Sequence, residues 1–244
     1  FPYTTLFRSL ADDVIQLVQA PPGPDDKIVA LDQLIAAGGP ATNAAVAFAA
    51  LGGRATLAAP VGAGPLAELV RADLAGTGVE LLDCSDRSGG SDGAGPAPGL
   101  SVSSCTITAG TGRRSVISTN ARAAVDTAPL DRYVARAACG QETPPDVVLI
   151  DGHNPALARA ALDLAARVGA LTVMDAGSWK DPAADLPARC DVVAASARFY
   201  PPGPAGPVTA PQDVARWLLD AGARGVVVIC QRSEERRVGK ECRS

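Results

Sequence analysis

The chain has 244 residues, of which 47% are hydrophobic and 4% aromatic, and its formal net charge is −4 at pH 7. A chain of this length can bury a core in one domain, and it has no run of about 18 apolar residues that would predict a membrane span. Because an acidic chain repels polyanions, we expect neither nucleic acid nor a membrane as a partner.

The cysteines are scattered. Five of them, Cys84, Cys105, Cys139, Cys190 and Cys230, are far apart and form no CxxC pair. This pattern fits a reducing cytoplasm better than a disulfide framework, and it predicts buried thiols and no metal site. We therefore expect a cytoplasmic protein.

The two ends of the chain can be encoded by the two complementary strands of one stretch of DNA. Residues 1–9 read FPYTTLFRS, and one permitted set of codons for them has a reverse complement that encodes RSEERRVGK, the string at 232–240. We therefore expect residues 1–9 and 232–244 to be translated sequencing adapter and residues 10–231 to be the natural core. Arg8 contributes one positive charge and residues 232–244 a net two, so the core alone carries −7.

The first half of the core predicts strands and helices of mixed character. Apolar spacing predicts strands at 13–18, 27–34 and 54–59 and helices at 42–51 and 66–75. Two half-polar strands, 100–108 and 113–118, flank the Ala-Gly-Thr-Gly turn at 109–112, which is typical of a hairpin. A low-complexity loop fills 85–99.

The second half alternates apolar strands with helices. Strands are predicted at 147–151, 170–175, 191–195 and 225–230, and helices at 155–168 and 214–221. Such alternation predicts βαβ units, and hence an α/β fold with a parallel central sheet flanked by helices.

The strongest local motif is GGPATNAA at 38–45, followed by Leu51-Gly52-Gly53. Paired glycines let backbone approach a ligand, and a helix that begins just after them presents free amides. Asn43 in the first turn offers both a donor and an acceptor, which suits vicinal hydroxyls. The motif also fits a tight turn with Asn43 near the helix cap.

Taken with the order of elements, GGPATNAAVAFAALGG resembles the PfkB family of carbohydrate kinases, which have the ribokinase-like fold. The segment VGAGPLAELVRADLAGTGVELL resembles the part that follows it in that family. The resemblance covers about residues 11–231. It implies a parallel sheet with a small β lid, formed near 12–35 and 100–119, and a C-terminal part of the sheet that is missing here.

The resemblance also implies roles on the substrate side. Asp12 matches the aspartate that binds sugar hydroxyls in that family, and Asp13 is the alternative if the alignment with the family shifts by one residue. Gly38, Gly39 and Asn43 match the substrate-contacting glycines and asparagine. The lid would exclude water from phosphoryl transfer and would pair two copies as a homodimer, although a β appendage used only for dimerisation is an alternative.

On the nucleotide and phosphate side, the resemblance implies ATP with Mg²⁺. Asp175 ends a strand at the edge where open α/β sheets bind ligands, and Lys180 is a phosphate candidate that equally fits a solvated loop. Ser196 stands where many relatives carry asparagine, which weakens the expectation of a metal-linked contact. His153, the one histidine, fits a hydrogen-bonded loop better than catalysis.

The family's late DTxGAGD motif, which supplies the anion hole and the basic aspartate, is absent from the chain. Gly62-Ala63-Gly64 and Gly93-Ala94-Gly95 are each followed by proline and occur too early. We therefore expect a parent kinase for a sugar or nucleoside, no catalytic residue in this chain, and an inactive polypeptide. A non-catalytic sugar-binding fragment or pseudoenzyme is the alternative. A Rossmann oxidoreductase is disfavoured, because no GxGxxG follows a first strand.

Overall fold

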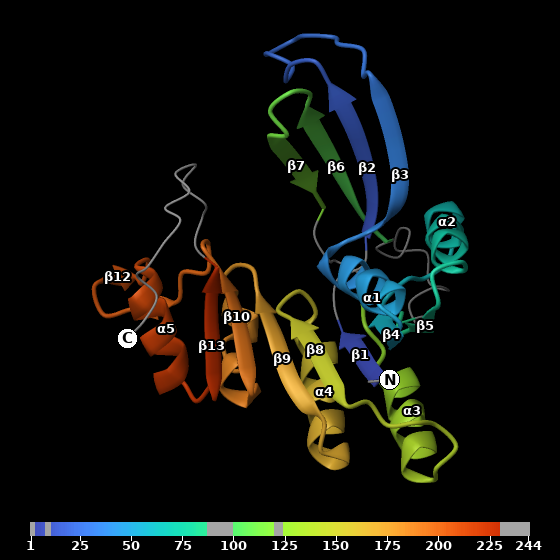
Figure 1. Ribbon diagram of the computed structural model, residues 1–244, viewed down its shortest axis with the longest axis vertical. Coiled ribbons are helices and arrows are strands. Elements are labelled where there is room, and N and C mark those ends of the chain that lie inside the picture. The colour runs from blue at the N-terminus through green and yellow to red at the C-terminus, as the bar shows by residue number, and fades with distance from the viewer. Residues whose placement is uncertain (1–2, 8–10, 87–99, 120–123, 230–244) are drawn as a thin grey trace, which may run out of the picture.

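The protein is described by a computed structural model, which places residues 3–7, 11–86, 100–119 and 124–229. Its described strands form a seven-stranded sheet, a four-stranded sheet that rises from it, and a two-stranded ribbon (Figure 1). In these residues no helix has the length and apolarity required to cross a membrane.

The seven-stranded sheet is parallel throughout and has the order β13-β10-β9-β8-β1-β4-β5. Its strands are β1 Tyr3–Phe7, β4 Arg54–Ala59, β5 Val79–Asp83, β8 Val147–Asp151, β9 Leu171–Ala176, β10 Val192–Ser196 and β13 Gly225–Ile229. Because the strands are parallel, their carboxyl ends meet at one edge, where ligands of open α/β sheets bind.

Helices cover both faces of this sheet. They are α1 Pro40–Ala50, α2 Pro65–Leu74, α3 Ala128–Ala138, α4 Pro155–Val168 and α5 Pro211–Asp220. Strand β4 shows the reason: Leu57 packs with α1 and α2, whereas its neighbour Ala58 packs with α3 and α4. Alternate residues of a strand point to opposite faces, so an apolar strand such as this one needs cover on both sides.

Small side chains let α1 lie close to the sheet. Ala41 and Ala45 are fully buried one turn apart on that helix and pack with Ala55 and Leu57 of β4. The scarcity of aromatic residues is thus offset by close approach of backbones. The larger core on the other face contains the buried Tyr133, whose hydroxyl donates to the Thr143 carbonyl at 3.0 Å.

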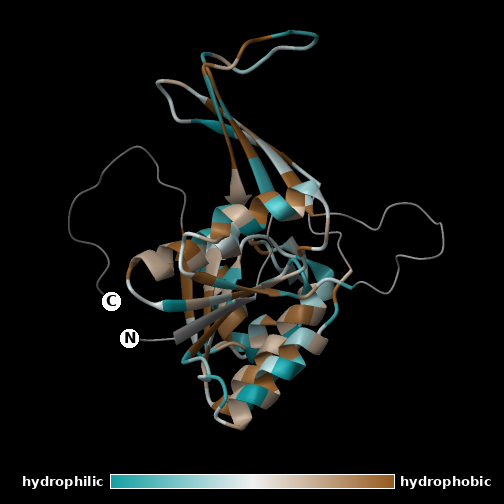
Figure 2. Ribbon diagram, turned by 90° about the vertical axis from the view of Figure 1, so that its right-hand side faces the viewer, coloured by the Kyte–Doolittle hydropathy of each residue, from teal (hydrophilic) through white to brown (hydrophobic). Residues whose placement is uncertain are grey.

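The four-stranded sheet, which we call the lid, has the order β3-β2-β6-β7. Its strands are β2 Ala11–Val18, β3 Asp32–Gly38, β6 Ser101–Thr108 and β7 Arg114–Ser118. β2 and β6 are parallel, and the two outer pairs are antiparallel. In the side view of Figure 2, the lid projects away from the layered core, and apolar and polar residues are mixed along its strands.

Most predicted elements are confirmed: 54–59, 147–151 and 155–168 match β4, β8 and α4 residue for residue, and the 109–112 turn joins β6 to β7. The predicted strand at 27–34 is wrong at both ends, because β3 runs from Asp32 to Gly38. β3 begins at Asp32, which pairs with Leu17, and β2 ends one residue later at Val18. Residues 27–30 therefore have no opposing strand to pair with.

Strand β1 lies in the range 1–9, for which the codons predict an adapter origin. Tyr3–Phe7 pair in parallel with β4 on one side and β8 on the other. Backbone pairing of this kind uses amides and carbonyls that every residue other than proline possesses. The adapter origin therefore stays a prediction, as does that of 232–244, which lies outside the described residues.

Candidate substrate and nucleotide sites

Asp12 is the most unusual side chain at the base of the lid. It is 0% exposed, and neither carboxylate oxygen has a hydrogen-bond partner in the described structure. Its position is fixed by pairing with Ala37 of β3 and Val102 of β6. Burial, and then the negative charges of Asp13 and Asp73, raise the pKa of the Asp12 carboxyl from 3.8 to about 6.

An unpaired buried carboxylate is costly to a folded protein unless a ligand supplies donors. The arrangement around Asp12 therefore suits a group rich in hydroxyl donors. Because Asp12 belongs to the second residue pair of β2 and β3, such a ligand would lie at the point where the lid meets the core.

Glycine is required at positions 38 and 39 of this junction for two different structural reasons. Gly38, the last residue of β3, pairs with Ala11, and a side chain on it would collide with the Asp13 carboxylate. Gly39 has φ 91°, a conformation that strains other residues, and it is the N-cap of α1. The turn thus directs the chain from the lid into the first helix.

The first turn of α1 brings two polar side chains to this region. Asn43 is exposed, and its backbone N–H donates to the Gly39 carbonyl at 3.1 Å. Thr42 is 1% exposed, and its Oγ1 has no partner among the described residues. The sequence analysis missed Thr42; its place between Gly-Gly-Pro and Asn43 was the available signal.

The residues predicted for the nucleotide side lie at or just after the carboxyl ends of β9 and β10, next to the end of β8. Asp175 is half-buried on β9 and is in register with Asp151 of β8 and Ala194 of β10. The Lys180 Nζ donates to the Ser178 hydroxyl at 3.1 Å and lies close to Gly152. Burial lowers the pKa of the Lys180 amine, and the Asp151 carboxylate opposes that shift.

Ser196 and His153 take part in local bonds at the same edge. The Ser196 hydroxyl donates to the Gly177 carbonyl and accepts from the Arg198 N–H, so it joins the loops after β9 and β10. The His153 N–H donates to Asp151 Oδ1 at 2.8 Å. Beside it, the N-cap Asn154 is 8% exposed, and its Nδ2 has no partner in the described structure.

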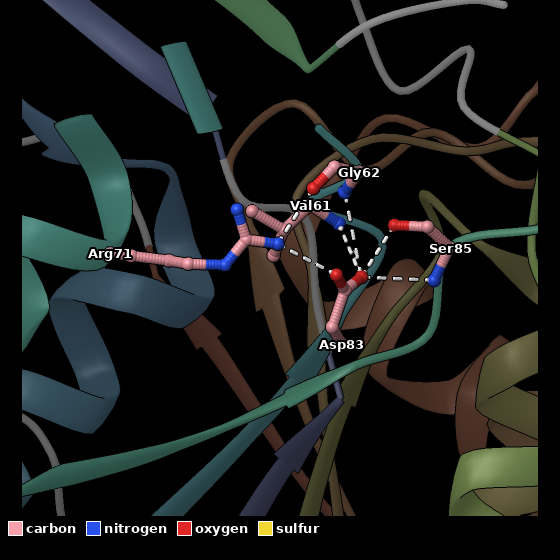
Figure 3. A network of polar contacts seen from close by, with 5 residues as sticks. All are labelled: Val61, Gly62, Arg71, Asp83 and Ser85. Atoms are coloured by element: carbon pink, nitrogen blue, oxygen red, sulfur yellow. Dashed lines mark hydrogen bonds and ion pairs between the residues drawn. The ribbon is translucent and has the colours of Figure 1, made fainter. Parts of the chain in front are cut away.

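A third polar centre stabilises the opposite end of the sheet. The Asp83 carboxylate at the end of β5 accepts from the N–H groups of Val61 and Gly62 and from Ser85, at 2.5–3.4 Å (Figure 3). The Arg71 guanidinium of α2 donates to Asp83 at 2.8 Å and to the Gly62 carbonyl at 2.6 Å. A cavity of about 550 Å³ adjoins Asp83 and is lined mainly by charged side chains of both signs.

The cysteines only partly follow expectation. Cys84 and Cys190 are buried, and burial raises the pKa of each thiol to about 12. Cys105 is half-buried, whereas Cys139 is exposed, because it caps the C-terminal end of α3 at the surface. Cys230 lies outside the described residues. Within those residues, no group of three or more His, Cys, Asp or Glu side chains is placed to hold a metal ion.

Neither the protein-family models nor the curated proteins contain a match to this sequence. Solved structures do match. A microbiome-derived acarbose kinase has a TM-score of 0.71 and 20% identity, over 93% of this chain and 69% of its own. The Arabidopsis thaliana ribokinase complexed with ribose and ATP has a TM-score of 0.61 and 15% identity, over 93% and 71%.

Phosphofructokinase-2 from Escherichia coli, in a tetrameric inhibited form, has a TM-score of 0.62 and 18% identity, over 93% of this chain and 73% of its own. The similarity therefore extends over the core and the lid together, at an identity that is informative about fold alone. The chain has the α/β ribokinase-like fold, with a parallel sheet, flanking helices and a β lid.

Proposed function

We propose that the protein to which this chain belongs is an ATP-dependent kinase that phosphorylates a hydroxyl of a sugar or nucleoside. The observation that carries the proposal is Asp12, which is fully buried and has no hydrogen-bond partner among the described residues, where the lid meets the core of a ribokinase-like fold. Ligand hydroxyls would donate to both of its oxygens. Gly38, Gly39 and Asn43 complete the proposed substrate contacts.

Phosphoryl transfer depends chiefly on positioning and on stabilising charge. For the nucleotide side we propose Lys180 as a phosphate contact, with Asp175 and Ser196 lining the same edge. The Ser196 hydroxyl is already engaged with Gly177, so its proposed part is to order the loop. Among the described residues no group of three or more His, Cys, Asp or Glu side chains is placed to hold a metal ion, which suits a Mg²⁺ carried largely by ATP phosphates.

The proposal assigns no catalytic residue to this chain. The family's GAGD turn supplies the anion hole and the general base, and no such string occurs in the 244 residues. We therefore propose that the C-terminal part of the sheet is missing, that adapter flanks the natural residues 10–231, and that this polypeptide transfers no phosphate.

The lid is also proposed to pair two copies. Apolar side chains are exposed on it or on the loop that joins β2 to β3, namely Ile28, Val29, Leu31, Leu34, Ile35, Val116 and Ile117. A patch of this kind on a projecting sheet favours self-association. We also propose a cytoplasmic location, on the grounds of the scattered thiols.

The kinase proposal is tested by two measurements. First, the chain is titrated by calorimetry with neutral sugars and nucleosides. At least one should bind, and Asp12→Ala should weaken that binding by at least about tenfold, the loss of one or two charged hydrogen bonds. Asp32→Ala, at the other end of β3, is the matched control and should bind as the unchanged chain does.

The second measurement extends the source reading frame past Gln231 and follows ATP consumption with the bound sugar. Turnover by the extended protein and none by this chain supports the kinase. Binding without turnover in both supports a non-catalytic sugar-binding protein. If the extended frame encodes no GAGD-like turn, the kinase proposal fails.

A further inference from the structure

The base of the lid carries three carboxylates in close proximity. Asp12 and Asp13 are successive residues of β2, so their side chains lie on opposite faces of the lid, and Asp13 packs against Gly38. Asp73 comes from α2, and its Oδ2 accepts the N–H of Ala37 at 2.7 Å, the residue that pairs with Asp12. The influence of both neighbours on the pKa of Asp12 is consistent with this proximity.

The cation nearest to this group along α2 is already engaged. Arg71 lies two residues before Asp73, but its guanidinium donates to the Asp83 carboxylate at 2.8 Å and to the Gly62 carbonyl at 2.6 Å (Figure 3). Both bonds come from Nη2 and are part-buried, and together they fix the side chain. Arg71 therefore neutralises Asp83 rather than the carboxylates at the base of the lid.

The described cations of the lid are at its far end. Arg113 and Arg114 are exposed at the hairpin after β6, and Lys27 is exposed in the connection after β2. Asp12 pairs with Val102, whereas the hairpin end of β6 is Thr108, six residues farther along. At about 3.3 Å per residue this is roughly 20 Å, more than the length of a monosaccharide.

Uncharged groups complete the base of the lid. The buried Thr42 Oγ1 has no partner in the described structure and can both donate to and accept from a hydroxyl. Within the part of the chain that is described, the base of the lid thus offers carboxylates and a hydroxyl to a ligand.

From this arrangement we propose that the site at the base of the lid selects substrates without phosphate or carboxylate groups, and accepts neutral or ammonium-bearing sugars in preference to sugar phosphates. This inference rests on the proposed function, because it specifies the substrate class of the same site. Like charges repel in a partly desolvated site, so Asp12 and Asp73 act against an anionic ligand, and Asp13 adds to this repulsion from the opposite face of the lid.

The test compares matched ligands by calorimetry on the full chain at pH 7. The pairs are fructose with fructose 6-phosphate, ribose with ribose 5-phosphate, and glucose with glucose 6-phosphate, and glucosamine tests the ammonium. We expect each sugar phosphate to bind at least about tenfold more weakly than its parent sugar. Glucosamine should bind at least as tightly as glucose.

Asp73→Asn tests the origin of the selectivity. The asparagine Oδ1 can still accept the Ala37 N–H, so the junction keeps its bond while it loses one charge. We expect the gap between parent sugar and sugar phosphate to narrow by at least about threefold, mainly through the phosphate. Asp32→Asn removes an equal charge at the distant end of β3 and should leave the gap unchanged. Thermal melts verify that both variants fold.

Three outcomes decide the matter. A sugar phosphate that binds more tightly than its parent overturns this inference and leaves the kinase proposal intact. An unchanged gap in Asp73→Asn shows that the carboxylates do not cause the selectivity, which also overturns it. If no sugar of either kind binds, the proposed function fails, and the substrate class fails with it.

Discussion

At the scale of single residues, Asp12 should make the unfolding free energy depend on pH. A carboxyl whose pKa is about 6 in the folded chain and near 3.8 when exposed favours folding only while it is protonated. Between these two values the unfolded chain releases a proton that the folded chain retains. Stability from this group is therefore complete below about pH 4 and declines as the pH rises to about 6.

Asp12→Asn should remove this pH dependence. Relative to the variant, the unchanged chain should lose roughly 1–3 kcal/mol of unfolding free energy between pH 4 and pH 6.5, and no more above that. Urea denaturation of both proteins across this range measures the difference, in which the titrations that both share cancel. Parallel curves at all pH values would show that Asp12 has an ordinary pKa.

At the scale of elements, α2 connects the lid to the edge of the main sheet. Arg71 binds Asp83 of β5 and Asp73 binds the backbone of β3, so a single helix contacts both sheets. The Arg71–Asp83 pair is 38% and 18% exposed, whereas the Arg216–Asp213 pair of α5 is 70% and 53% exposed. Their N–O distances, 2.8 and 2.9 Å, are nearly equal.

Because the two ion pairs differ in burial but not in length, their removal should lower the unfolding free energy by unequal amounts. Asp83→Ala leaves the Arg71 guanidinium and the N–H groups of Val61, Gly62 and Ser85 without this acceptor and should cost about 2–3 kcal/mol of unfolding free energy. Asp213→Ala should cost at most about 0.5 kcal/mol. Guanidinium denaturation gives both values, and equal losses would contradict a structural role for the Asp83 network.

At the scale of the whole molecule, the projecting lid determines how the protein would associate. Val29 is 86% and Ile117 is 79% exposed. Large apolar side chains exposed together are typical of a surface that binds another protein. Leu51, the C-cap of α1, is 84% exposed but belongs to the core rather than to a strand of the lid.

If two lids pair, Ile117→Lys should weaken the dimer at least about tenfold, because it places a charge in an apolar contact. Leu51→Lys adds the same charge at similar exposure and should leave the dimer intact. Sedimentation velocity over a concentration series measures both. A chain that is monomeric at every concentration, or a dimer that Ile117→Lys leaves unchanged, would refute pairing through the lid.

The sequence alone determined the features that depend on neighbours along the chain. The apolar period of 147–151 and the helical spacing of 155–168 predict β8 and α4, and the paired glycines predict the turn into α1. Local backbone preference and the need to bury apolar faces are sufficient for such elements. Asp12 was a candidate substrate-binding residue only because of its position in the sequence.

Only the tertiary structure decided what depends on distant partners. The start of β3 was fixed by the end of β2, against an apolar pattern that favoured an earlier start. The negative charge of Asp73, which raises the pKa of Asp12, is 61 residues away in the sequence. Likewise, the Ser196 hydroxyl donates to the carbonyl of Gly177, which is on a different loop. Desolvation and Coulomb interactions depend on separation in space, which the order of residues does not give.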